Sequence, residues 1–176
     1  MATTCTRYNQ TIAEACRNSQ PGIKSIWLAN YSDVTGYVFS GSTDIVSGVT
    51  MSGSTTFYKV AVNKQVASVM DTGTVNVQNG VSISKPSLSF KVQGFSEEVR
   101  KMYEQLMQAT VIAVVQTIDL NYYILGLTNG LDAVEITYGT EAGSDGFKGL
   151  TIKLEGLESK PFFRFNMPTF SSIVAA

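Results

Sequence analysis

One long alternating stretch in the first half of the chain constrains the fold more than any other feature. Between residues 66 and 92 the chain reads VASVMDTGTVNVQNGVSISKPSLSFKV. Apolar and polar residues alternate on both sides of Asn79-Gly80, a pair favoured in tight hairpin turns because both residues tolerate positive φ. Pro86 has no N–H to donate, so part of this segment must be a sheet edge or a bulge. The pattern predicts a long hairpin with a polar face, which either pairs with a neighbouring molecule or lies over the chain's own core.

Period-two alternation also marks the rest of the chain as β-rich. In residues 23–34, Ile26 and Leu28 are expected on one strand face and Trp27 on the other. Short β runs separated by Gly/Ser turns follow, and residues 111–117 form an apolar run typical of a strand buried on both faces. A second Asn-Gly pair, Asn129-Gly130, predicts another turn. Further strands are expected in the segments NYYILGL, DAVEITY, GLTIKLEG and FFRFN.

A single packed helix is expected at residues 96–109. Ser96 is a suitable N-cap, and two glutamates follow in the first turn, where the helix dipole favours acidic side chains. The helical spacing predicts one apolar stripe, made of Val99, Met102, Tyr103, Leu106 and Met107. A short helix is also expected within residues 8–18, ending before Pro21-Gly22.

Together these patterns predict a mainly β fold with one packed α-helix (α+β), built as an antiparallel sandwich or barrel. The expected organisation is an N-terminal arm with a short helix (1–22), a β-sandwich domain (23–160) and a C-terminal strand and tail (161–176). Cys5 and Cys16 fall in the first segment, and both the free-thiol and the disulfide states remain open.

The amino-acid composition excludes several classes of function. Only 15% of residues are charged while 44% are hydrophobic, against about 25% charged in typical soluble domains. A surface with so few charged residues is typical of a protein whose surface is covered by copies of the same chain. The net charge of −1 argues against a strongly basic nucleic-acid binder. The absence of histidine removes the commonest general base and metal ligand. No membrane association is expected, because no apolar run approaches the length of a spanning helix.

The glycine-rich stretch YGTEAGSDGFKG at residues 138–149 does not match a chemical motif. A phosphate loop needs Gly-Lys-Ser/Thr leading into a helix, whereas Lys148-Gly149 leads into an alternating strand. Glu141 and Asp145 alone do not supply the ligands of an EF-hand, although a weak calcium site using backbone carbonyls remains possible. We expect a flexible connection between two strands, ordered by a neighbouring subunit. The carboxylate pairs Glu97/Glu98 and Glu155/Glu158 are expected to be solvated, and no catalytic residue, metal or cofactor is expected.

Residues 111–156, VIAVVQTIDLNYYILGLTNGLDAVEITYGTEAGSDGFKGLTIKLEG, resemble a group of virion proteins from tailed phages of Bacteroidetes hosts, crAss-like phages included. The matching features are the buried AVV strand, the aromatic YYILG strand, the NGL turn, and the glycine-rich stretch with the strand that follows it. Upstream, GIKSIWLANYSDV and FYKVAVNKQVASVMDTGTVN also resemble that group. The likeness extends over roughly residues 20–160.

The resemblance implies a structural protein of the tail tube, tail ring or head–tail connector. Such proteins form closed rings, commonly hexamers or dodecamers, which contact neighbouring tail or connector proteins and let genomic DNA pass through the lumen without sequence-specific binding. The protein would be part of the virion, assembled in the host cytoplasm. The resemblance carries no catalytic residues. The predicted subunit-interface residues lie in the long hairpin and the glycine-rich stretch: Val75, Val77, Asn79, Gly80, Val81, Ile83, Glu141, Asp145 and Phe147.

Two alternatives remain open at this point. A capsid decoration or head-associated protein would also be β-rich. A small carbohydrate-binding module would use surface aromatic side chains, for which the candidates are Trp27, Tyr31, Tyr122 and Tyr123. An enzyme is not expected.

Overall fold

The computed structural model describes residues 21–41, 44–62, 66–143, 146–166, 170 and 173–174, and the elements formed by these residues are mainly β with one α-helix. This confirms the predicted fold class. The expected N-terminal helix and both cysteines lie outside the described residues. The elements are β1 (Ile23–Asn30), η1 (Tyr31–Asp33), β2 (Val34–Phe39), β3 (Ile45–Met51), β4 (Tyr58–Val60), β5 (Ser68–Asn76), β6 (Val81–Gln93), α1 (Glu97–Leu106), β7 (Val111–Thr117), β8 (Tyr122–Leu125), β9 (Asp132–Thr140), β10 (Lys148–Glu155) and β11 (Phe163–Phe165).

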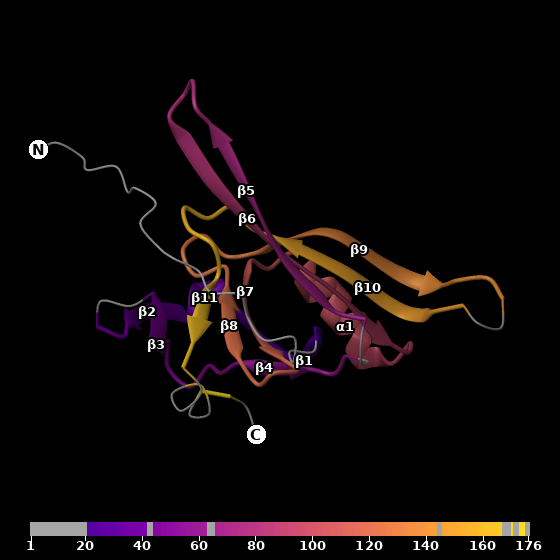
Figure 1. Cartoon of the computed structure of the whole chain (residues 1–176). Coiled ribbons are helices and arrows are strands. Elements are labelled where there is room, and N and C mark those ends of the chain that lie inside the picture. Colours follow the sequence, from indigo (N-terminus) through magenta and orange to yellow (C-terminus); the bar gives the residue numbers. More distant parts are fainter. Residues whose placement is uncertain are drawn as a thin grey trace, which may run out of the picture.

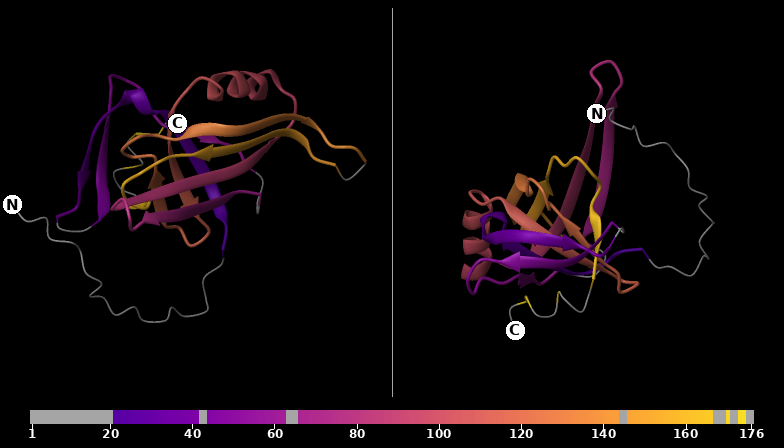
Figure 2. Two further views of the ribbon diagram at one scale, coloured as in Figure 1. Left: turned by 90° about the horizontal axis from the view of Figure 1, so that it is seen from above. Right: turned by 90° about the vertical axis from the view of Figure 1, so that its left-hand side faces the viewer.

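The strands form two sheets packed as a sandwich (Figures 1 and 2). The large sheet has the order β2-β3-β11-β8-β7-β1-β4, and the small sheet has the order β5-β6-β10-β9. Neighbouring strands are antiparallel except β11 and β3, which run parallel. β11, expected in a separate C-terminal segment, is therefore an internal strand of the large sheet.

The main core lies between the two sheets. Ile26 and Leu28 of the large sheet belong to the same buried cluster as Phe90 and Ile152 of the small sheet. Trp27 belongs to a second cluster on the other face of the large sheet, as the alternation in β1 predicts. Every residue of β7 except the last is buried, which confirms the strand predicted to be covered on both faces.

The second core includes Phe170, which lies near the C-terminus. Phe170 is 3% exposed, and its ring packs edge-on against Trp27, with centroids 5.0 Å apart, and against Phe57 at 5.6 Å. The backbone N–H of Phe57 donates to the carbonyl of Ile173 at 2.9 Å. Phe170, Ile173 and Val174 thus help to cover the outer face of the large sheet around Trp27.

Helix α1 begins as predicted and ends earlier. Ser96 caps it through a hydrogen bond from the Val99 N–H at 3.4 Å, and Val99 and Leu106 are buried. The prediction for Met107 is wrong: the helix stops at Leu106, and Met107 is the C-cap with a 61% exposed side chain. The helix contacts β9 and β10 (Figure 2).

Candidate self-association surface

The long hairpin leaves the sandwich. β6 pairs with β10 only from Ser87 to Gln93, so its first half has β5 as its partner strand and the two extend together past the end of the small sheet. Figure 1 shows this projection, which we call the arm and define as residues 72–83. Pro86 lies where β10 ends, and its carbonyl accepts the N–H of Gly156 at 3.0 Å. Beside Pro86, β6 has β5 on one side and residues 156–158 on the other, so the edge or bulge predicted for this segment is not found at Pro86 itself. Within the described residues the segment has a free edge only beyond Ser84.

The arm exposes apolar side chains on both of its faces. Val75 is 70% exposed and pairs with Ser82, so these two share one face. Ile83, which is 36% exposed, pairs with Thr74 on the opposite face. Val77 at the tip is 86% exposed and Val81 is 44% exposed. The described chain therefore holds four aliphatic side chains here that its own fold does not bury.

The tip is a four-residue loop and not the tight two-residue turn that the Asn-Gly pair predicts. Asn76 and Val81 are the last paired residues. The side-chain oxygen of Asn76 accepts the N–H of Asn79 at 3.1 Å, and only Gly80 has a positive φ, 63°. A loop of this length is commonly built around a type I turn, which requires no positive φ at the asparagine.

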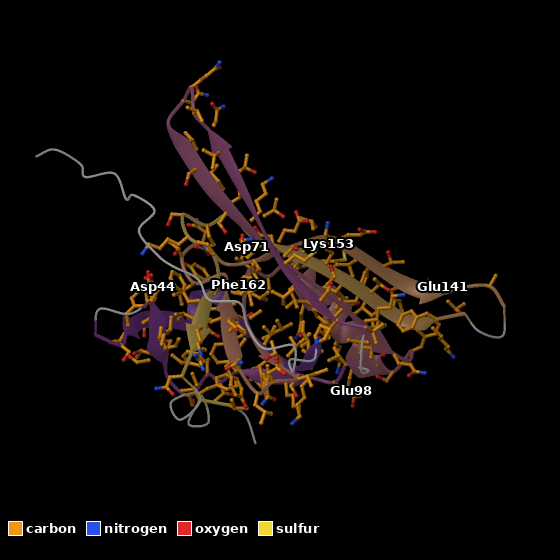
Figure 3. The ribbon with its side chains drawn as sticks, viewed as in Figure 1. Asp44, Asp71, Glu98, Glu141, Lys153 and Phe162 are labelled. Atoms are coloured by element: carbon orange, nitrogen blue, oxygen red, sulfur yellow. The ribbon has the colours of Figure 1, made fainter. Side chains whose placement is uncertain are left out.

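The base of the arm is held by a polar cluster (Figure 3). One carboxylate oxygen of Asp71 accepts the hydroxyl of Ser84, and the other accepts the N–H of Phe162 at 3.1 Å. Ser84 is buried and exchanges two backbone hydrogen bonds with Glu158, both 2.8 Å. These contacts attach both strands to the segment that leads into β11.

Glu158 is a second anchor, and the expectation that it is solvated is wrong. Its side chain is buried, and one carboxylate oxygen accepts the N–H groups of Thr128 and Asn129 at 3.1 and 3.0 Å. The turn predicted at Asn129-Gly130 is therefore held by a carboxylate from a distant segment. Gly130 has φ of 78°; a Cβ there would come within 2.4 Å of Thr110, so the site requires glycine.

The glycine-rich stretch joins β9 to β10 and closes on itself. Glu141 and Phe147 exchange two hydrogen bonds: the Glu141 N–H donates to the Phe147 carbonyl at 2.8 Å, and the Phe147 N–H donates to the Glu141 carboxylate at 3.1 Å. Lys91 lies 3.9 Å from that carboxylate and 4.8 Å from the centre of the Phe147 ring. Asp145 lies outside the described residues.

The predicted interface residues therefore form two groups. The arm and the β9–β10 loop extend from opposite ends of the small sheet, and the label of Glu141 in Figure 3 marks the loop end. A surface that uses both groups would have to contact two different neighbours, or two separate parts of one.

Two of the aromatic side chains proposed for a carbohydrate site are buried. Trp27 is 8% exposed and Tyr122 is 7% exposed, and burial raises the pKa of the Tyr122 hydroxyl. Tyr123 is half-buried against Phe162, with ring centroids 5.5 Å apart. The hydroxyl of Tyr31 donates to the carbonyl of Thr128. These four residues do not form an exposed aromatic platform.

The outer face of the small sheet is polar and carries charges of both signs. Lys153 lies 2.7 Å from Glu155, and this hydrogen bond raises the pKa of Lys153. On α1, Arg100 pairs with Glu97 at 2.8 Å and with Glu104 at 2.5 Å. The hydrogen bond from Arg100 holds the pKa of Glu97 below its ordinary value. Oppositely charged neighbours thus leave these two surfaces near neutral.

Sequence reasoning missed a groove between α1 and β4. It has a volume of about 940 Å³, and its floor includes the buried Leu28, Val99 and Leu106. Exposed Tyr58 and Ala61 lie on the β4 side. The groove combines segments about 40 residues apart, and neither segment alone carries a recognisable motif.

The part of the chain that the structure describes contains no group of three or more acidic, cysteine or histidine side chains placed to hold a metal. Nor does that part contain a helix long and apolar enough to cross a membrane. Comparison with known proteins gave no match: no family model, curated protein or solved structure is significantly similar to this chain.

Proposed function

We propose that this chain is a structural protein of a bacteriophage virion, which assembles with copies of itself into a closed ring of the tail tube or head–tail connector. The observation that carries the proposal is the arm. A hairpin anchored at its base and bearing Val75, Val77 and Val81 in solvent is suited to contact another molecule, because apolar surface is stabilised when it leaves water.

The ring geometry follows from where the binding surfaces would lie. An arm that extends from one end of a molecule and contacts a different surface on the next copy makes a head-to-tail interface, which closes into a ring when the rotation between copies fits. The assignment to a phage particle rests on the sequence resemblance over residues 20–160. Under this proposal the near-neutral outer face of the small sheet suits a channel wall along which DNA moves without being held.

Light scattering after size exclusion, together with electron microscopy of the purified chain, tests the proposal. We expect particles several times the mass of the 19.0 kDa chain, seen as rings with a central opening. Monomers or trimers that bind only to capsids would favour the decoration protein instead. A chain that stays monomeric at high concentration would contradict self-assembly.

A further inference from the structure

We propose that the arm of one copy lies in the groove between α1 and β4 of the next copy, with one arm strand running alongside β4. This inference rests on the proposed self-assembly and identifies the surface that receives the arm. Three properties of the groove match three properties of the arm.

The first match is that the groove and the arm each have an unpaired strand edge. β4 is the last strand of the large sheet, and within the described residues no strand pairs with its outer edge. β5 is likewise the last strand of the small sheet, so the arm also presents a free edge. Free N–H and C=O groups on such edges are satisfied when a strand from another molecule is added.

The second match is apolar surface. Tyr58 is 62% exposed at the mouth of the groove, above a floor that includes Leu28 and Val99. The arm carries Val77 and Val81, with exposed fractions of 86% and 44%. A tyrosine beside an apolar pocket is the type of residue that contributes most to binding energy at interfaces.

The third match is charge. No charged residue lies between Asp71 and Lys85, so the whole arm is neutral. Among the described residues that line the groove, only Lys59 and Glu98 are charged. Lys59 lies over the ring of Trp27, 5.9 Å from its centre. Burying the arm therefore requires little desolvation of charge, whereas an anionic partner would find no cluster of positive charge here.

The arm is also organised before it binds. Asp71, Ser84 and Glu158 hold its base, so docking does not have to order both strands from a disordered state. In Figure 1 the arm points away from α1, which prevents it from reaching the groove of its own chain. The contact would therefore join two different copies.

A complementation experiment tests the pairing in the full-length chain. The arm variant carries Val77→Lys and Val81→Lys, and the groove variant carries Tyr58→Lys and Ala61→Lys, so the altered arm and the altered groove repel each other. All four side chains are exposed, so circular dichroism should report a folded chain for both variants. We expect each variant alone to self-associate roughly 30-fold more weakly or worse, the loss typical of a binding hot spot.

Mixing the two variants gives the decisive result. The arm variant keeps an intact groove and the groove variant keeps an intact arm, so light scattering should detect a dimer that contains one of each. Leu120→Lys and Val38→Lys are matched controls, at exposed fractions of 58% and 61% and away from both surfaces. Both should assemble like the unmodified chain.

The outcomes separate this inference from the proposed function. An unmodified chain that forms rings, with a groove variant that assembles equally well or a mixture that stays monomeric, would overturn the inference alone. An unmodified chain that never self-associates would overturn both. If a double variant fails to fold, Val77→Ser and Ala61→Glu alone repeat the same experiment with a smaller perturbation.

Discussion

The two hairpins of the small sheet have the same secondary structure and very different surroundings. The β9–β10 hairpin is covered by α1: Tyr138 packs against Phe95, with ring centroids 4.7 Å apart, and against Tyr103 at 5.9 Å. Its loop is closed by Glu141. In the β5–β6 hairpin the aliphatic side chains beyond Gly73 lie in solvent.

The difference shows that pairing strands and burying them are separate steps. Backbone hydrogen bonds along β5 and β6 continue to Asn76 and Val81, but an isolated two-stranded hairpin is only marginally stable in water. The arm keeps its shape through the contacts at its base. Further burial requires a partner, whereas the β9–β10 hairpin already has one in α1.

The largest expected change in the free energy of unfolding comes from shortening one side chain in each hairpin to alanine. Ile152 in β10 is fully buried, so Ile152→Ala should lower the free energy of unfolding by about 2–5 kcal/mol. Val75→Ala in the arm should change it by less than ~0.5 kcal/mol, because that side chain is already in solvent. Urea denaturation at concentrations that keep the chain monomeric measures both. Equal losses would show that the arm is buried within its own chain.

A smaller change in the free energy of unfolding is expected for a substitution at the base of the arm. Glu158→Ala removes the acceptor of two backbone N–H groups and should cost about 1–3 kcal/mol. Amide hydrogen exchange should accelerate at Thr128 and Asn129. Glu155→Ala is the matched control: it breaks a partly exposed pair with Lys153 and should cost under ~1 kcal/mol. Unchanged exchange at both amides would contradict the anchoring role of Glu158.

The smallest change in the free energy of unfolding is expected for a substitution in the loop of the β9–β10 hairpin. Glu141→Gln keeps an acceptor for the Phe147 N–H but removes the attraction to Lys91. The stability of the whole chain should fall by less than ~1 kcal/mol, since the pair is 3.9 Å apart, Glu141 is exposed and Lys91 is only partly buried. Exchange of the Phe147 amide should accelerate while the amides of the arm stay unchanged. Unchanged or slower exchange at Phe147 would mean that the carboxylate does not close the loop.

The sequence was informative about elements with strong local patterns. The faces of β1, the doubly buried β7 and the Ser96 cap were predicted because each depends on residues within a few positions of one another. Local reasoning failed at Met107 and at the tip of the arm. A helix end and a turn type depend on competing geometries that differ by small energies.

The surface that would bind a partner was predicted only in part. Val75 and Val77 were identified from their place in a long hairpin with a polar face. The groove was not identified, because it combines β4 with α1, and Glu158 was misassigned because its hydrogen-bond partners lie about 30 residues away in the chain.

By itself, the sequence determined that this chain would form β-strands with one inserted helix and that a long hairpin would turn near Asn79-Gly80, but not whether that hairpin would project from the core. Periodicity and turn chemistry act over short distances, so they can be interpreted without knowing the fold. Only the tertiary structure decided which side chains lost contact with water. Burial depends on which distant segments meet, and this placed Trp27 inside, left Val77 outside, and brought β4 and α1 together around a groove.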